Sequence, residues 1–305
     1  MAELMKESMR ATFAQPDVRT FSSYLAKVPK IPSKIRRSAS SVRTSIDRSR
    51  TQIALDELAQ IGASSGTAPF AKPCLVGTFH KTGTTLVWKI LQDLAHFGQF
   101  DLWNIGMYPD EADKPWLVGF DWWSDFDHNG LDVAQFPTVA MIRDPRNVLV
   151  SSMKFHKVSA EPWLHVPRGE LGGQTYQQAL CALETDEERF HFELKHQGGS
   201  TIADMLAAKR NPAHAETLFL PLEDLMGDYT LSAYKRMWEH LGLSDAYLPL
   251  AMAVAFQHSV FRPGFRKSKH ITSGRPKVWQ QTLPQSVLDA LDEAYPNAAE
   301  ELGYE

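Results

Sequence analysis

The stretch Pro73-Cys-Leu-Val-Gly-Thr-Phe-His-Lys-Thr-Gly-Thr-Thr-Leu86 decides the fold. Its first half, Pro73–Phe79, is a short apolar run after a proline and predicts a buried strand. Its second half leads into residues 86–97, where apolar side chains recur at helical spacing. A turn between a strand and a helix presents free backbone N–H groups at the positive end of the helix dipole. Such a junction predicts a site for a terminal phosphate or sulfate.

The side chains of this turn suit an anion. Lys81 supplies a full positive charge, Gly83 lets the backbone come close, and three hydroxyl groups add donors, those of Thr82, Thr84 and Thr85. The alternative interpretation is a capped turn with a surface lysine. The order differs from a Walker A loop, in which the lysine follows the last glycine. Here Lys81 precedes Gly83, so a plain NTPase is disfavoured.

Beyond this turn, segments that predict strands alternate with segments that predict helices. Residues 137–142 and 217–222 are two more apolar runs that predict buried strands, and residues 147–155 and 231–241 have helical spacing. Strands that alternate with helices predict an α/β domain with a mainly parallel central sheet flanked by helices. Residues 283–304 are expected to form a closing helical segment.

Two of these segments resemble the PAPS-dependent sulfotransferases, where PAPS is 3′-phosphoadenosine-5′-phosphosulfate. Lys81-Thr-Gly-Thr-Thr85 is similar to their 5′-phosphosulfate loop, in which Lys-Ser-Gly-Thr-Thr follows the first strand. Val139–Phe155 is similar to their 3′-phosphate segment, where a strand delivers an arginine and a serine follows eight residues later; Arg143 and Ser151 have that spacing. An arginine at a strand end gives a forked donor to phosphate.

Two further matches are less specific. Glu216–Leu225 resembles the family's strand that ends in Tyr-Glu-Asp-Leu, and its role is expected to be structural. Thr272–Trp279 resembles the loop that closes on the 3′-phosphate, with Ser273, Gly274 and Arg275 as its candidate contacts, although an ordinary cationic loop is the alternative. The resemblance covers residues 70–305. It departs at Leu86 and Leu222, where many members carry an aromatic residue that contacts adenine.

The resemblance implies a P-loop-like sulfotransferase fold and an enzyme that moves a sulfuryl group from PAPS to a hydroxyl or amine of a small-molecule acceptor. It implies that Lys81 neutralises charge on the bridging oxygen and that Thr84, Thr85 and loop amides hold the 5′ end. Arg143, Ser151 and Arg275 are expected to hold the 3′-phosphate. The family needs no metal. A kinase with a degenerate P-loop and a non-catalytic nucleotide-binding scaffold are the alternative functions.

A general base is needed for a hydroxyl acceptor. The family often places a histidine shortly before the second strand, and the candidates there are His128 and Asp121; His80, His156 and the absence of any side-chain base stay open. The same segment holds Trp116, Trp122 and Trp123 beside three aspartates, at 121, 125 and 127. Aromatic faces beside carboxylates suit a cation, so a cationic acceptor is one option. The alternative is that the tryptophans belong to the hydrophobic core and the aspartates to a solvated loop.

Composition sets further bounds. The 305 residues are 43% hydrophobic and 22% charged, which excludes a wholly disordered chain. Residues 1–50 carry eleven basic and four acidic residues and predict a flexible basic arm, with a partner-binding segment and a transit peptide as alternatives. Residues 51–69 predict a short helix and a linker.

The chain after residue 50 has a net negative charge, which disfavours nucleic acid as a partner. Two cysteines and no long apolar run predict a cytoplasmic protein without a membrane span.

Overall fold

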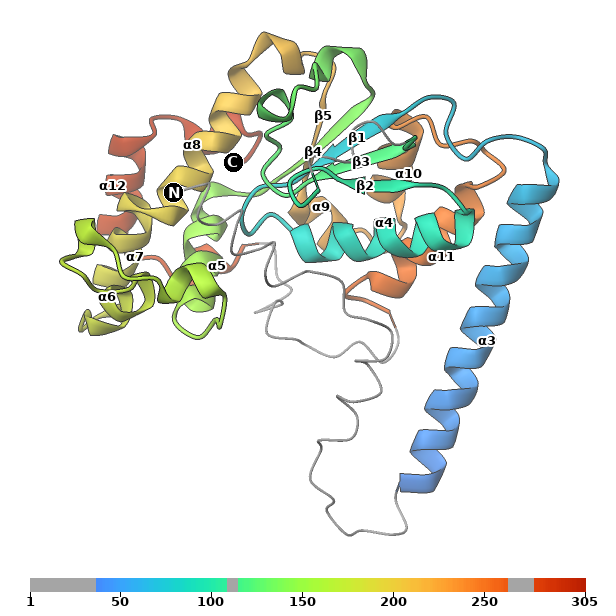
Figure 1. Ribbon diagram of the computed structural model, residues 1–305. Coiled ribbons are helices and arrows are strands. Elements are labelled where there is room, and N and C mark those ends of the chain that lie inside the picture. The colour runs from blue at the N-terminus through green and yellow to red at the C-terminus, as the bar shows by residue number, and fades with distance from the viewer. Residues whose placement is uncertain (1–36, 109–114, 263–276) are drawn as a thin grey trace.

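A parallel five-stranded sheet forms the centre of the molecule (Figure 1). The computed structural model describes residues 37–108, 115–262 and 277–305. The strand order is β2-β3-β1-β4-β5, and every neighbouring pair is parallel. The strands are β1 (Cys74–Gly77), β2 (Leu102–Asn104), β3 (Val118–Asp121), β4 (Thr138–Ile142) and β5 (Leu218–Pro221). Parallel strands need crossover connections, so helices cover both faces of the sheet.

The three strands at the centre of the sheet, β1, β3 and β4, are buried at every position. Their side chains alternate between two cores. Val76 and Met141 belong to one hydrophobic cluster, whereas Ala140 and Ile142 belong to the other. This two-sided burial explains why these strands are continuous apolar runs rather than alternating ones.

Two helical layers enclose the sheet (Figure 1). One core packs the sheet against helices α4 (Thr84–Gly98), α10 (Ser232–His240) and α11 (Leu248–His258), with α3 (Arg37–Ser64) beside them. The other core packs it against α5 (Pro145–His156), α7 (Asp186–Lys195), α8 (Gln197–Arg210) and α12 (Gln285–Ala294). Shorter helices complete the layers: α6 (Tyr176–Ala182), α9 (Leu222–Gly227) and α13 (Ala298–Glu301). The predicted α/β class is therefore confirmed.

The long helix α3 differs from the sequence prediction of a short helix and a linker. It begins at Arg37, inside the predicted arm, and ends at Ser64, inside the predicted linker. The sequence has no proline between residues 37 and 64 and no glycine before Gly62, so nothing there stops a helix. Leu55 and Leu58 pack into the core on the α4 side. Residues 1–36 lie outside the described residues, so the flexible arm there stays a prediction.

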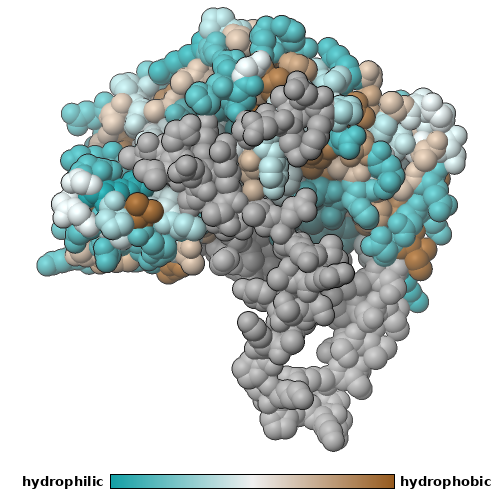
Figure 2. Space-filling view, viewed as in Figure 1, coloured by the Kyte–Doolittle hydropathy of each residue, from teal (hydrophilic) through white to brown (hydrophobic). Residues whose placement is uncertain are grey.

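The surface of the described residues mixes hydrophilic and hydrophobic side chains on the face seen in Figure 2. Among the helices that the structure describes, none is both long and apolar enough to cross a membrane.

Candidate functional site

The turn between β1 and α4 is built on a left-handed backbone. Gly83 is the N-cap of α4 and has φ of 102°, a region that favours glycine. A Cβ atom at Gly83 would lie 2.7 Å from Cδ1 of Leu222 at the start of α9. Lys81 also has a positive φ, of 66°. The turn therefore depends on glycine both for its dihedral angles and for its close contact with α9.

The first turn of α4 has free backbone donors. The amides of Leu86 and Val87 donate to the carbonyl oxygen of Gly83 at 2.9 and 3.1 Å. The amides of Gly83, Thr84 and Thr85 donate no hydrogen bond within the described residues. These three N–H groups are at the positive end of the helix dipole, so the junction can bind an anion.

Two of the predicted hydroxyl donors stabilise the turn itself. The Thr82 hydroxyl donates to the carbonyl of Phe79 at 2.9 Å and accepts from the Phe79 amide at 2.8 Å. The Thr84 hydroxyl donates to the same carbonyl at 3.2 Å and accepts from Thr78 at 3.0 Å. The Thr85 hydroxyl makes no hydrogen bond to the described residues. Thr82 and Thr84 therefore shape the loop, and the donors open to a ligand are backbone amides and Thr85.

Arg143 brings the two main sequence motifs together. It follows the last residue of β4, and its Nη1 donates to the carbonyl oxygen of Lys81 at 2.9 Å. Its Nε lies 3.7 Å from Oε1 of Glu223, an ion pair with little solvent exposure on either side. The carboxyl end of β4 is beside that of β1 in the sheet, which is why the two loops meet.

A small network supports this arginine. Glu223 accepts from Nδ2 of Asn147 at 3.0 Å and from the Tyr304 hydroxyl at 3.0 Å. The amide of Trp279 donates to Oδ1 of Asn147 at 3.3 Å, and the guanidinium carbon of Arg146 is 3.9 Å from the centroid of the Trp279 ring. Trp279, the last residue of the segment that resembles the 3′-phosphate loop, thus lies against the start of α5. Ser273, Gly274 and Arg275 lie outside the described residues.

Ser151 is on α5, two turns after Arg143, and is 8% exposed. Its hydroxyl makes no hydrogen bond to the described residues. It is on α5, the helix that follows the Arg143 loop. Its role as a phosphate donor stays a prediction.

Lys81 occupies an unusual environment. Its ammonium nitrogen is 3.4 Å from the centroid of the Phe155 ring, a cation–π contact. Burial is the main cause that lowers the pKa of Lys81 to about 7; the nearby Arg143 adds to the shift, and Glu161 and Glu193 oppose it. A bound anion beside this ammonium would favour its charged form.

The two candidate bases from the sequence are in different settings. Asp121 is fully buried at the end of β3, directly beside Gly77 of β1. Its Oδ1 accepts from the amides of Trp123 and Asp125 at 2.7 and 3.2 Å, so the carboxylate orders the following turn. His128 is exposed in a 3₁₀ helix, Asp127–Asn129. Both assignments stay predictions.

The tryptophans of this segment do not form one aromatic face. Trp122 is 4% exposed, packs against Phe120 and donates to Oδ1 of Asn104. Trp116 packs against Trp103 of the edge strand β2. The ring of Trp123 is 6.2 Å from that of His80 in the β1–α4 turn, and the Thr78 hydroxyl of the same turn donates to the backbone carbonyl of Trp122 at 3.3 Å.

A buried row of hydrogen bonds starts at the turn. Nε2 of His80 and Nε2 of His156 are 2.9 Å apart, and Nδ1 of His156 is 2.7 Å from Oε1 of Glu193. The Tyr176 hydroxyl donates to Oε2 of the same carboxyl group at 3.0 Å. Burial lowers the pKa of both histidines and raises the pKa of Glu193 to about 8.

The sequence left His80 and His156 among the open alternatives for the base and did not single out Glu193 or Tyr176. Glu193 is one of several acids on a charged helix, α7, and only the tertiary structure shows that it is the one fully buried there.

The fold has a counterpart among solved structures. A crystal structure of a mouse sulfotransferase complexed with PAP is similar, with a TM-score of 0.52 and 13% sequence identity over 75% of this chain and 85% of that chain. A retinol dehydratase in complex with androsterone and inactive cofactor PAP is matched with a TM-score of 0.43 and 15% identity, over 81% of this chain and 87% of that chain. No family model and no curated protein matches the sequence. The chain therefore has the α/β fold seen in that mouse sulfotransferase.

Proposed function

We propose that this protein is a sulfotransferase that moves a sulfuryl group from PAPS to a hydroxyl or amine of a small-molecule acceptor. The observation that carries the proposal is the contact between Arg143 and the carbonyl of Lys81. It joins two loops that the sequence assigns to opposite ends of one bisphosphorylated nucleotide. Free amides, a lysine and an arginine then lie at one edge of the sheet, where ligands of open α/β folds bind.

Each group has a role in such a transfer. Sulfuryl transfer resembles phosphoryl transfer, with in-line attack and charge spread over the equatorial oxygens, so positioning and electrostatic stabilisation dominate. The amides of Gly83, Thr84 and Thr85 hold the 5′ end, and Lys81 neutralises charge on the leaving oxygen. Arg143, Ser151 and Arg275 hold the 3′-phosphate, with Ser273 and Gly274 in the same loop.

Adenine is held without the aromatic residues that the resemblance leads one to expect. Leu86 and Leu222 are at those positions, and Leu222 packs against Gly83 and the apolar core. The ring of Trp279 stacks on Arg146, on the Arg143 side of the site, and is an aromatic candidate to contact adenine. A cationic acceptor is a narrower form of the proposal, with the Trp123 ring beside His80 as a candidate aromatic face. Two free cysteines, Cys74 and Cys181, suit a reducing cytoplasm.

The test is isothermal titration with adenosine 3′,5′-bisphosphate (PAP) in the absence of magnesium. We expect micromolar or tighter binding by the wild type and a loss of about 100-fold in affinity for Arg143→Ala, because a charge-assisted bidentate donor is removed. Arg210→Ala is the control, since this exposed arginine pairs with Glu301 on the surface.

The competing functions give different results in the same titration. Binding of ATP with magnesium and no binding of PAP would favour a kinase. Binding of PAP with no turnover of PAPS, unaffected by Lys81→Ala, would favour a scaffold.

A further inference from the structure

The hydrogen-bonded row behind the turn has a defined direction. The Glu193 carboxyl group accepts from the Tyr176 hydroxyl on one oxygen and meets Nδ1 of His156 on the other. When Glu193 is ionised, it can only accept, so His156 carries its proton on Nδ1. Nε2 of His156 is then an acceptor, and Nε2 of His80, 2.9 Å away, must be the donor. The lone pair of His80 is therefore on Nδ1.

Accessibility increases along the row toward the turn. Glu193, His156 and Tyr176 are fully buried, whereas His80 is 7% exposed. Nδ1 of His80 makes no hydrogen bond within the described residues. His80 directly precedes Lys81, the residue assigned to the leaving oxygen. The open end of the row is thus beside the donor site, and its closed end is in the helical core.

Aromatic rings fix the orientation of His80. Its ring lies side by side with that of His156 and nearly in the same plane, with centroids 5.0 Å apart and 14° between the planes, as their Nε2–Nε2 hydrogen bond requires. Trp123 is stacked on the same side chain at 6.2 Å, and Phe155 and Trp163 meet it edge-on. An imidazole held in this way is positioned before a substrate binds, as a general base must be.

We propose that His80 is the general base of the reaction and that His156 and Glu193 position it and take up the proton. The proposal rests on the proposed sulfuryl transfer. It replaces His128 and Asp121, the bases suggested by the sequence, because Asp121 is engaged by backbone amides and His128 is exposed.

The proton transfer balances. The acceptor oxygen attacks sulfur, and the bond from sulfur to the bridging oxygen breaks, leaving the electron pair on the nucleotide. The acceptor proton bonds to His80 Nδ1, the proton of His80 Nε2 moves to His156 Nε2, and the proton of His156 Nδ1 moves to Glu193 Oε1. Both histidines end neutral with exchanged tautomers, and Glu193 ends as a neutral carboxylic acid.

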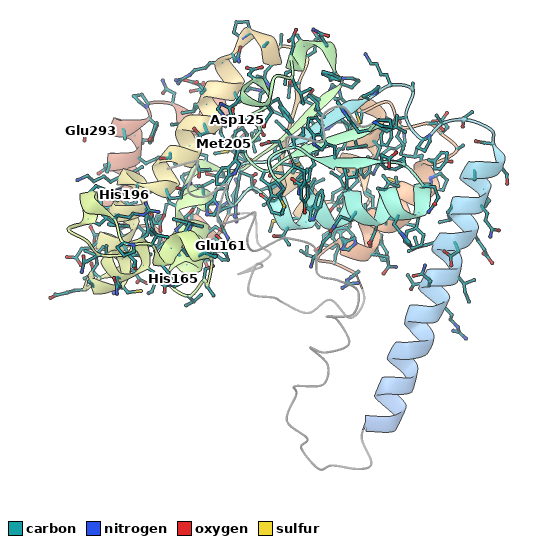
Figure 3. The ribbon with its side chains drawn as sticks, in the orientation of Figure 1. Asp125, Glu161, His165, His196, Met205 and Glu293 are labelled. Carbon is teal, nitrogen blue, oxygen red and sulfur yellow. The ribbon has the colours of Figure 1, made fainter. Side chains whose placement is uncertain are left out.

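The pKa of Glu193 agrees with this step. Burial raises it to about 8, so the carboxyl group holds the arriving proton near neutral pH, while both buried histidines resist becoming cations. The other charged groups that act on the row are Lys81 from the turn, Arg168 from the segment between α5 and α6, and His196 after α7. Glu161, from the same segment as Arg168, acts on Lys81. Figure 3 shows Glu161 and His196 in the helical layer that contains α5 to α8.

The kinetic test measures release of PAP from PAPS with 4-nitrophenol, and with water, as acceptor. The base must be deprotonated, so wild-type kcat should rise with pH through about 8. We expect His80→Asn to lower kcat about 100-fold and His156→Asn and Glu193→Gln about 10- to 100-fold. In Glu193→Gln the rise should move to lower pH, because the remaining histidines have lowered pKa values.

Controls separate this proposal from the proposed function. His214→Asn alters another buried histidine, one that contacts Thr217, and should leave kcat within about twofold. The Kd for PAP should change by less than about threefold in every variant, since none supplies a phosphate donor. If the wild type fails to bind PAP, the sulfotransferase proposal fails. If all variants bind PAP and His80→Asn keeps the wild-type kcat and pH profile, the relay is wrong.

A second measurement tests the relay without any substrate. Long-range proton–nitrogen spectra of the full chain, with ¹⁵N-labelled histidine, report which ring nitrogen carries the proton. We expect His80 and His156 to exchange tautomers together as pH crosses about 8, with neither becoming an imidazolium. Fixed tautomers across this range, or His80 protonated on Nδ1 at pH 9, would overturn the proposal even if the variants do not fold.

Discussion

Lys81 couples nucleotide binding to protonation. Its pKa of about 7 is well below the ordinary 10.5, so at pH 8 the side chain is mostly neutral in the free protein. A bound phosphate or sulfate raises that pKa, and binding therefore takes up a proton. We expect uptake of about one proton per PAP at pH 8, and an affinity that falls as pH rises from 7.

Titration calorimetry at pH 8 in two buffers of different ionisation enthalpy counts these protons. Lys81→Met is the matched variant, because it keeps the length of the side chain and removes the titrating group. Equal proton uptake by wild type and variant would show that Lys81 does not carry the linkage.

The junction between β1 and α4 depends on Gly83. Alanine there must adopt φ of 102° and would place its Cβ 2.7 Å from Leu222, so we expect Gly83→Ala to lower the free energy of unfolding by about 1–3 kcal/mol. PAP affinity should fall as well, because the loop amides move. Urea denaturation measures the first effect. Gly227→Ala is the control, since nothing lies within 4 Å of its Cβ and the change should be within about 1 kcal/mol. Similar losses in both variants would contradict this account.

Among the elements, those with a strong local pattern could be predicted from sequence. Strands β1, β4 and β5 and helices α4, α5 and α10 have apolar runs or helical spacing that identify them. Strands β2 and β3 have only three and four residues, and β3 is held by its register with β1, from Cys74–Val118 to Gly77–Asp121. Length alone is not the reason, because β1 and β5 also have four residues. Strand β3 contains Gly119, which weakens a strand pattern, and it is held in place by its pairing with β1 and β2.

The residues of the candidate site also differ in how far the sequence predicts them. Lys81, Gly83 and Arg143 belong to contiguous motifs in which each residue has a fixed spacing. The row from His80 to Glu193 spans 113 positions of the chain, and its members meet only because α5 and α7 pack together. Sequence suggested two of its histidines and could not show that a buried carboxyl group orients them.

At the scale of the whole molecule, the last residues of the chain stabilise a site built near its first strand. The Tyr304 hydroxyl donates to Glu223, which pairs with Arg143, and Arg146 donates to the carbonyl of Glu305. Tyr304→Phe would leave an oxygen of the largely buried Glu223 without this donor. We expect the free energy of unfolding to fall by about 1–3 kcal/mol and the Kd for PAP to rise several-fold, because Glu223 orients Arg143.

Tyr229→Phe is the matched control for this prediction, since Tyr229 is 78% exposed and its hydroxyl can be replaced by water contacts. Urea denaturation and PAP titration of the two variants compare the buried hydroxyl with the exposed one. A Tyr304→Phe protein as stable as Tyr229→Phe would mean that Glu223 finds another donor. If Tyr304→Phe loses stability but keeps its PAP affinity, Arg143 is positioned by its bond to the Lys81 carbonyl alone, and the C-terminus stabilises the fold without shaping the site.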